Sequence, residues 1–131
     1  MATFPQKSDF VKTYNDGKAQ VLWTTLVADL ETSVSAYLKL AENDDYSSLL
    51  ESVEGGAIRG RYTFIGLKPD IIWRANGDSP EINRRVLSGV REEDFVPTGN
   101  GALDSLRDLF SESLIGLPEG MPPSAAGLIG Y

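Results

Sequence analysis

The side chains best suited to chemistry lie in two short segments that flank a glycine-rich turn. Leu49-Leu50-Glu51-Ser52 places a carboxylate beside a hydroxyl, and Arg61-Tyr62-Thr63-Phe64-Ile65-Gly66 begins nine residues after Ser52 with a guanidinium. Arg61 can hold a ligand carboxylate through two hydrogen bonds, and Ser52 offers one donor and two acceptor sites. The pattern therefore suits a small polar ligand, such as an amino acid, bound on a pair of strands.

A purely structural interpretation of the same residues stays open. Neighbouring residues of a strand point to opposite faces, so Glu51 and Ser52 share one pocket only if the strand bulges or one of them contributes its backbone. Both side chains can instead be solvated near a strand end, with Arg61 paired to Glu51 or to Glu54.

Catalytic chemistry has few candidates in this chain. It has no histidine and no cysteine, which removes the commonest general base and any thiolate metal site. The glycines of the turn fit neither the Rossmann nor the P-loop phosphate pattern. Adjacent acids can bind Mg²⁺ or act as acid and base, but in loops they are more often solvated; they are Asp44, Asp45, Glu92, Glu93 and Asp94. We predict no catalytic residue and no metal site in these 131 residues.

The composition is that of one ordinary globular domain. Of 131 residues, 41% are hydrophobic and 24% charged, which is enough to form a core without disulfides. The net charge of −7 disfavours nucleic acid and anionic membranes as partners. No apolar run approaches the ~20 residues needed to span a bilayer, so a soluble, cytoplasmic protein is expected.

Hydrophobic periodicity and turn signals predict three helices and five strands. The expected helices are residues 8–14, capped by Ser8, 33–42, capped by Thr32 or Ser33, and 102–113, capped by Asn100. The expected strands are residues 20–28, 46–54, 60–67, 70–75 and 81–87. Asn76-Gly77 predicts a hairpin between the last two strands, and residues 88–101 are expected to form a surface loop. The fold class is therefore α+β, with a mostly antiparallel sheet.

Apolar spacing also predicts which faces are buried. The second helix is expected to bury Val34, Tyr37, Leu38 and Ala41, and the third Leu103, Leu106 and Phe110. Trp23 and Trp73 are expected in the core. The last eight residues read as an apolar strand, which is unusual at a natural terminus, so we expect that the chain continues beyond Tyr131 in the complete protein.

Several segments, in this order and spacing, resemble the start of anthranilate synthase component I. The run from Leu26 to Leu40 resembles the first helix region of that family, in which proline often stands at the position of Ser33. Leu49-Leu50-Glu51-Ser52-Val53 matches the effector motif of the family. The segments that follow also fit: Arg61-Tyr62-Thr63-Phe64-Ile65-Gly66, Gly66-Leu67-Lys68-Pro69-Asp70 and Ala126-Gly127-Leu128-Ile129-Gly130-Tyr131.

The resemblance implies an enzyme and assigns this chain a regulatory part of it. The full-length enzyme would convert chorismate, with Mg²⁺ and ammonia or glutamine, to anthranilate and pyruvate, and a separate glutamine amidotransferase subunit, component II, would supply the ammonia. Residues 1–131 would be the N-terminal, tryptophan-sensing region and part of a larger β-sandwich. The chorismate and Mg²⁺ sites would lie in a C-terminal region that this chain lacks, so these residues alone are expected to be inactive.

The resemblance also implies an effector site for L-tryptophan. Ser52 carries over as an effector contact, Glu51 as its neighbour, and Arg61 as a basic residue near the effector. Three alternatives remain at this stage: aminodeoxychorismate synthase component I of the folate pathway, a stand-alone amino-acid-sensing module that is not an enzyme, and a generic interaction domain.

Overall fold

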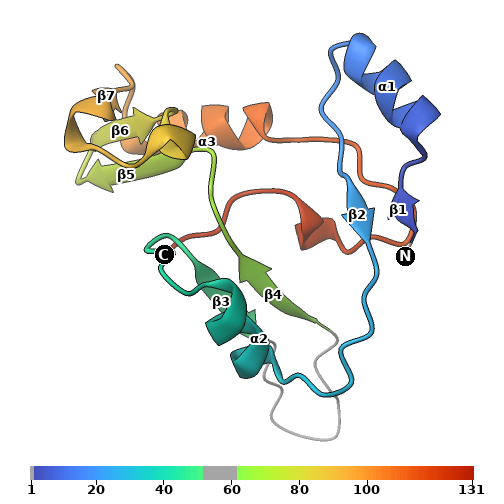
Figure 1. Ribbon diagram of the computed structural model, residues 1–131. Coiled ribbons are helices and arrows are strands. Elements are labelled where there is room, and N and C mark those ends of the chain that lie inside the picture. Colours follow the sequence, from blue (N-terminus) through green and yellow to red (C-terminus); the bar gives the residue numbers. More distant parts are fainter. Residues whose placement is uncertain (1, 52–61) are drawn as a thin grey trace, which may run out of the picture. The chain divides into compact units, whose positions relative to one another are not determined.

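The computed structural model describes residues 2–51 and 62–131, which form three α-helices and seven short strands (Figure 1). The chain divides into two compact units, Met1–Asp29 with Arg107–Tyr131, and Leu30–Leu106. Every strand pair in the described residues is antiparallel. The predicted α+β class with three helices is therefore confirmed. None of the helices in the described part of the chain is long and apolar enough to cross a membrane.

In the first unit, a two-stranded ribbon holds the chain on either side of helix α1. Strand β1 (Thr3–Phe4) pairs with β2 (Trp23–Thr24), and the rings of Phe4 and Trp23 stack with centroids 4.8 Å apart. Helix α1 (Lys7–Asn15) lies between these strands in sequence, and the Gln20 side chain donates to the Phe10 carbonyl at 2.9 Å. The pairing of β1 with β2 and two side-chain bonds, from Gln20 to Phe10 and from Thr24 Oγ1 to the Ala2 carbonyl, thus hold this part of the chain together.

Three predictions for this unit were wrong. Ser8 does not begin α1, because the helix starts at Lys7 and its N-cap is Gln6. The strand expected over residues 20–28 is only two residues long, since among residues 2–51 and 62–131 β2 pairs with β1 alone, and β1 has two residues. The final residues form a 3-10 turn, Pro123–Ala125, and no strand in the described chain.

The second unit contains two separate sheets. Strand β3 (Ser48–Glu51) pairs with β4 (Thr63–Gly66), and helix α2 (Ser33–Leu40) precedes them (Figure 1). The other sheet has the order β5-β6-β7, with β5 (Ile72–Asn76), β6 (Ser79–Asn83) and β7 (Val96–Pro97). The predicted strand pair around the glycine-rich turn and the predicted hairpin are both present.

The β5–β6 hairpin turns one residue later than predicted. Asn76 pairs with Ser79, so the two-residue loop is Gly77-Asp78. Gly77 has φ of 59°, which only glycine adopts at no steric cost. A glycine in the first loop position is typical of a type II′ turn, whose twist matches that of the strands.

Helix α3 (Ala102–Glu112) begins with a cap that comes from this hairpin loop. The Ala102 N–H donates to the Asp78 carboxylate at 2.7 Å, while the Gly101 carbonyl accepts the first helical bond, from Ser105, at 2.9 Å. Gly101 is therefore the N-cap residue, and the capping oxygen comes from Asp78, which lies 24 positions before Ala102. The sequence had suggested Asn100 for this role.

The buried face of α3 is also different from the predicted one. Ser105 and Leu109 are buried, four residues apart, whereas Leu103 is 68% and Phe110 53% exposed. Trp73 of β5 fixes this face of the helix, because its indole N–H donates to the Ser105 hydroxyl at 2.9 Å. A polar contact from the sheet has thus selected a helix face that apolar spacing alone does not indicate.

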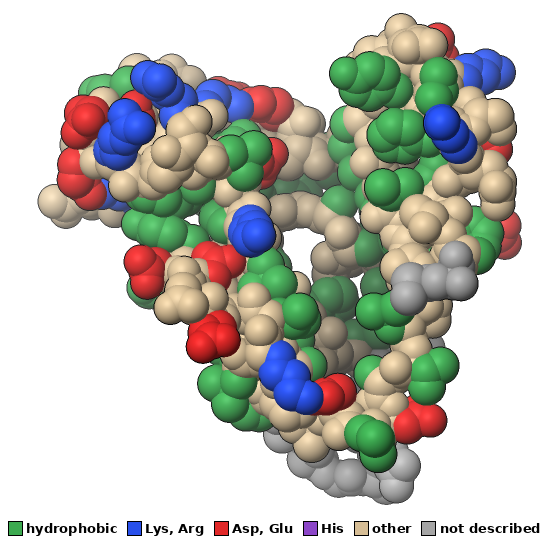
Figure 2. Space-filling model, viewed as in Figure 1, with side chains coloured by type: hydrophobic (Ala, Val, Ile, Leu, Met, Phe, Trp, Pro, Cys, Tyr) green, Lys and Arg blue, Asp and Glu red, His purple; other side chains and the backbone are tan. Residues whose placement is uncertain are grey.

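Residues 88–101 are more ordered than a surface loop. They include β7 and a 3-10 helix, Glu92–Asp94, and Phe95 between them is buried. The hydrophobic side chains buried in the described residues are few: Ile82, Val86, Phe95 and Leu109. Figure 2 shows many hydrophobic side chains at the surface. Two of the residues of α2 that were expected to face inward are exposed, Val34 by 50% and Leu38 by 65%.

Candidate functional site

Of the three predicted site residues, the structure describes only Glu51. It is the last residue of β3 and pairs with Thr63 of β4. Ser52 and Arg61 lie outside the described residues, and Glu51 is held by the elements around it.

The carboxylate of Glu51 is held by the first residue of α2. The Ser33 hydroxyl donates to Glu51 Oε1. Ser33 is the N1 residue of the helix, where the unpaired N–H groups and the helix dipole favour a negative charge. A carboxylate has about four acceptor positions, and this bond uses one of them.

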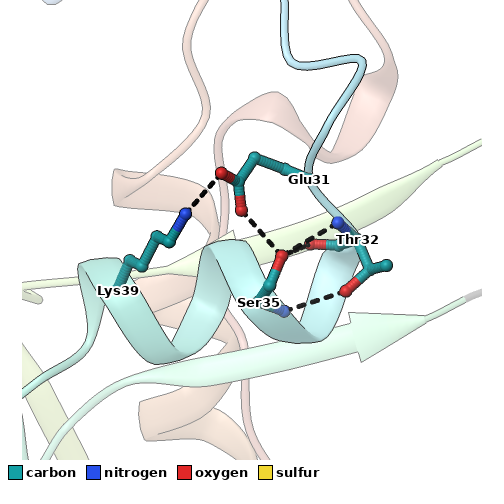
Figure 3. Close-up of polar contacts among 4 residues, drawn as sticks. All are labelled: Glu31, Thr32, Ser35 and Lys39. Carbon is teal, nitrogen blue, oxygen red and sulfur yellow. Dashed lines mark hydrogen bonds and ion pairs between the residues drawn. The ribbon is translucent and has the colours of Figure 1, made fainter.

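A capping box fixes the start of α2 (Figure 3), and Ser33 directly follows its first member, Thr32. The Ser35 N–H donates to Thr32 Oγ1 at 3.0 Å, and the Thr32 N–H donates to Ser35 Oγ at 2.9 Å. Each side chain thus satisfies an N–H that the helix itself leaves without a partner. Thr32 was one of the two predicted caps, and this prediction is confirmed.

Glu31 extends this cluster along the helix (Figure 3). Its carboxylate accepts from the Ser35 hydroxyl at 2.7 Å and forms an ion pair with Lys39. The hydrogen bond from Lys39, and then that from Ser35, lowers the pKa of Glu31. The carboxylate therefore stays charged to lower pH than an isolated glutamate and ties two turns of α2 together.

Two further contacts connect α2 and the β3–β4 pair. The Tyr37 and Ser47 hydroxyls are 2.8 Å apart. Asp44, in the turn after α2, accepts from the Tyr46 N–H and from the Lys68 N–H, both at 3.1 Å. Lys68 lies just after β4 and has φ of 49°. The β3–β4 pair is therefore held at both of its strands by polar contacts with the α2 segment.

This arrangement suits binding and holds no constellation for catalysis. In the described residues, no three acidic side chains lie together in a way that could hold a metal ion. Three of the five loop acids considered for Mg²⁺, Asp44, Glu92 and Asp94, have other partners. Asp44 caps backbone N–H groups, Glu92 forms an ion pair with Arg74, and Asp94 forms one with Arg85. A carboxylate fixed on a strand can accept hydrogen bonds from an ammonium or an indole N–H.

The clearest charged network lies on the other sheet and is structural. Arg74 of β5 donates through two nitrogens to Glu92 and through Nε to Glu81, and its guanidinium lies 3.8 Å above the centroid of the Phe95 ring. These bonds, those with Glu92 first, raise the pKa of Arg74 and lower that of Glu92. The network fastens the Glu92–Asp94 turn to the sheet.

A cavity in the first unit offers few groups that could do chemistry. It has a volume of about 470 Å³. Its lining is mostly apolar, with Lys7 as the single ionisable side chain: Ala2, Thr3, Pro5, Gln6, Lys7, Phe10 and Leu22. Glu51, the described residue of the predicted site, is not among the residues that line this cavity.

Comparison with known proteins bears out the resemblance. The chain is 44% identical over 93% of its length to anthranilate synthase component 1 of Cereibacter sphaeroides, and 39% identical over 96% to that of Synechocystis. It is 51% identical over 81% of its length to that of Neisseria meningitidis serogroup B. The chain spans about a quarter of the length of these curated relatives: 24%, 24% and 20%, respectively. No protein-family model and no solved structure matches it.

Proposed function

We propose that the chain, which is similar to anthranilate synthase component 1 over nearly its whole length, is the N-terminal, regulatory region of such a protein. The observation that supports this most strongly is the 44% identity to the Cereibacter sphaeroides protein over 93% of the chain. The names of the relatives favour the anthranilate enzyme over its aminodeoxychorismate sibling.

The complete protein would convert chorismate and ammonia to anthranilate and pyruvate in tryptophan biosynthesis. A component 1 implies a second component, and the proposed partner is a glutamine amidotransferase that supplies the ammonia. The chorismate site, Mg²⁺ and the rest of a larger β-sandwich are assigned to the three quarters of the relatives that this chain does not span. The sequence composition agrees with this assignment, since it contains no histidine for acid–base chemistry.

The region described here would bind L-tryptophan as a feedback inhibitor. The resemblance assigns Ser52, Glu51 and Arg61 to this effector site. Tryptophan carries an ammonium, a carboxylate and an indole N–H, and these residues offer a carboxylate, a guanidinium and a hydroxyl to match them. Inhibition requires that tryptophan bind an inactive arrangement of the enzyme more tightly than the active one.

The full-length gene product supplied with chorismate, Mg²⁺ and ammonia tests this proposal. Anthranilate fluorescence should rise with time, and L-tryptophan should suppress the rise. Replacement of Ser52 by Phe should relieve the inhibition while turnover persists. Chorismate consumption without anthranilate would favour the aminodeoxychorismate enzyme, and no turnover would favour a sensing module without catalytic activity.

A further inference from the structure

We infer that Asp44 and Lys68 form a strained joint, which holds the chain between β4 and β5 in one of two backbone courses. Residues 67–71 connect the β3–β4 pair to the β5–β6–β7 sheet, so the backbone of Lys68 directs the chain from one sheet toward the other. The joint is closed when the Asp44 carboxylate accepts from the Lys68 N–H and open when this bond is broken. Its closure needs neither an effector nor a catalytic group.

Two unusual backbone conformations meet at this contact. Among the described residues, Asn43 and Lys68 are the two non-glycine residues with positive φ, 67° and 49° respectively. Asn43 directly precedes Asp44, whose carboxylate accepts from the Lys68 N–H at 3.1 Å across 24 positions of sequence. Residues in sparsely populated backbone conformations persist only where their surroundings hold them, and they cluster in segments that switch. The meeting of both residues at one hydrogen bond therefore indicates a joint.

The strain is larger at Lys68 than at Asn43. Asparagine enters the left-handed region at small cost, whereas the Cβ of a lysine comes too close to the following carbonyl oxygen. Lys68 also precedes Pro69, and a proline moves the residue before it toward an extended conformation with φ of about −120°. An extended conformation of Lys68 is therefore the alternative from which the closed joint keeps it.

The side of the joint that follows α2 is firmly held. The Asp44 N–H donates to the Ala41 carbonyl at 2.9 Å, and the Ser47 hydroxyl donates to the Asp44 carbonyl at 2.9 Å. Asp44 Oδ1 accepts from the Tyr46 N–H at 3.1 Å, while Oδ2 accepts from Lys68. The carboxylate thus has a fixed position, and the residue that moves when the joint opens is Lys68.

Opposing free energies of similar size act on the closed joint. The bond from the Lys68 N–H to a charged carboxylate favours closure, but Lys68 is exposed, so water competes for the same N–H. The left-handed backbone of Lys68 opposes closure. Such a balance leaves the open joint measurably populated. When the joint opens, Lys68 becomes extended and residues 67–71 take a different course toward β5.

Hydrogen exchange of the full-length gene product, measured by mass spectrometry with residue resolution, tests the joint at the Lys68 N–H. Asp44→Ala should raise the exchange rate of this N–H about tenfold, because the N–H loses its acceptor and the strain is released. Asp45→Ala, which removes the neighbouring carboxylate, should leave the rate unchanged. A rate that Asp44→Ala does not change would overturn the inference.

Substitution of Lys68 separates backbone strain from the lysine side chain and leaves Asp44 in place. Lys68→Gly should slow exchange at position 68 about fivefold relative to its intrinsic rate, because glycine adopts positive φ without a steric cost. Lys68→Ala keeps a Cβ and therefore the strain, so its exchange should equal that of the wild type. Equal slowing in both variants would assign the effect to the side chain and overturn the inference. These two variants decide the question even if Asp44→Ala does not fold.

Two further measurements show whether the change is local and whether the open course exists. Exchange in the β5–β6 ladder should be the same in all variants, and an increase there as large as at Lys68 would mean general destabilisation and contradict the joint. A crystal structure of full-length Asp44→Ala should show Lys68 with negative φ. A positive φ retained without Asp44 would mean that the rest of the fold imposes it, and the joint would then have no open state.

Discussion

The cap of α3 gives a prediction whose size follows from the structure. Replacing Asp78 by Ala removes the oxygen that accepts from the Ala102 N–H at 2.7 Å. Loss of a capping side chain costs about 1 kcal/mol, and loss of a negative charge at a helix N-terminus costs a further ~0.3–1 kcal/mol. We therefore expect Asp78→Ala to lower the free energy of unfolding by about 1–2 kcal/mol, and Asp78→Asn, which keeps an acceptor, by less.

A substitution at Gly101 tests whether the effect of Asp78→Ala comes from the bond between the Asp78 carboxylate and the Ala102 N–H. A Cβ added at Gly101 would lie 3.0 Å from Asp78 Oδ1 and 3.2 Å from Oδ2, so the carboxylate would have to move away from the Ala102 N–H. Gly101→Ala should therefore destabilise the wild type more than it destabilises Asp78→Ala. The two substitutions should couple by about 0.5–1 kcal/mol, as expected for residues in direct contact.

Urea unfolding followed by circular dichroism measures both quantities, and amide hydrogen exchange at Ala102 reports the capping bond directly. Exchange at Ala102 should become faster in Asp78→Ala, whereas exchange in the β5–β6 ladder should change less. Strictly additive effects of the two substitutions, or unchanged exchange at Ala102, would refute the assignment of Asp78 as the cap.

Three further predictions concern the charged contacts and the core. Arg74→Lys should lower the salt-sensitive part of the free energy of unfolding, because an ammonium cannot bond Glu92 through two nitrogens or stack on the Phe95 ring. Thermal melts of both proteins at low and high salt check this, and equal melting temperatures would contradict it. The pKa of Glu31 is below the ordinary carboxyl value of 4.5, so its small contribution to stability should be fully present above pH 4.5 and lost as the pH falls through the lowered pKa. The melting temperatures of the wild type and of Glu31→Gln, measured from pH 6 to pH 3, should therefore become equal at the acid end. Leu109→Ala should cost about 2–5 kcal/mol, because the side chain is only 4% exposed, while Leu103→Ala on the same helix should change stability by less than ~0.5 kcal/mol in urea unfolding.

Short-range signals in the sequence predicted the start of α2 and the β5–β6 hairpin, whose loop lies one residue later than expected. Thr32 and the residues after it form a capping box three positions apart, and the β5–β6 hairpin needs only a two-residue loop with Gly77. Such features depend on residues that are neighbours in the chain, so their interactions can be derived from spacing.

The predictions for α3 failed because its cap and its buried face depend on contacts between distant residues. Apolar spacing suggested the wrong face for α3, because that face is set by Trp73, 32 positions away, and its cap by Asp78, 24 positions away. The predicted site also involves a contact between residues that are far apart in the sequence. The sequence indicated Glu51, but its partner Ser33 is 18 residues away and carried no signal beyond a helix start.

The small core has a consequence for the heat capacity of this chain. Unfolding raises the heat capacity mainly by exposing apolar surface, and an ordinary domain of this length would show about 1.6–2.0 kcal/mol per kelvin. Here four hydrophobic side chains of the described residues are buried, whereas Val27, Leu30 and Leu87 are among those already more than three-quarters exposed. Calorimetry of the 131 residues should therefore give a distinctly smaller value, with a broad transition and a flat dependence of stability on temperature.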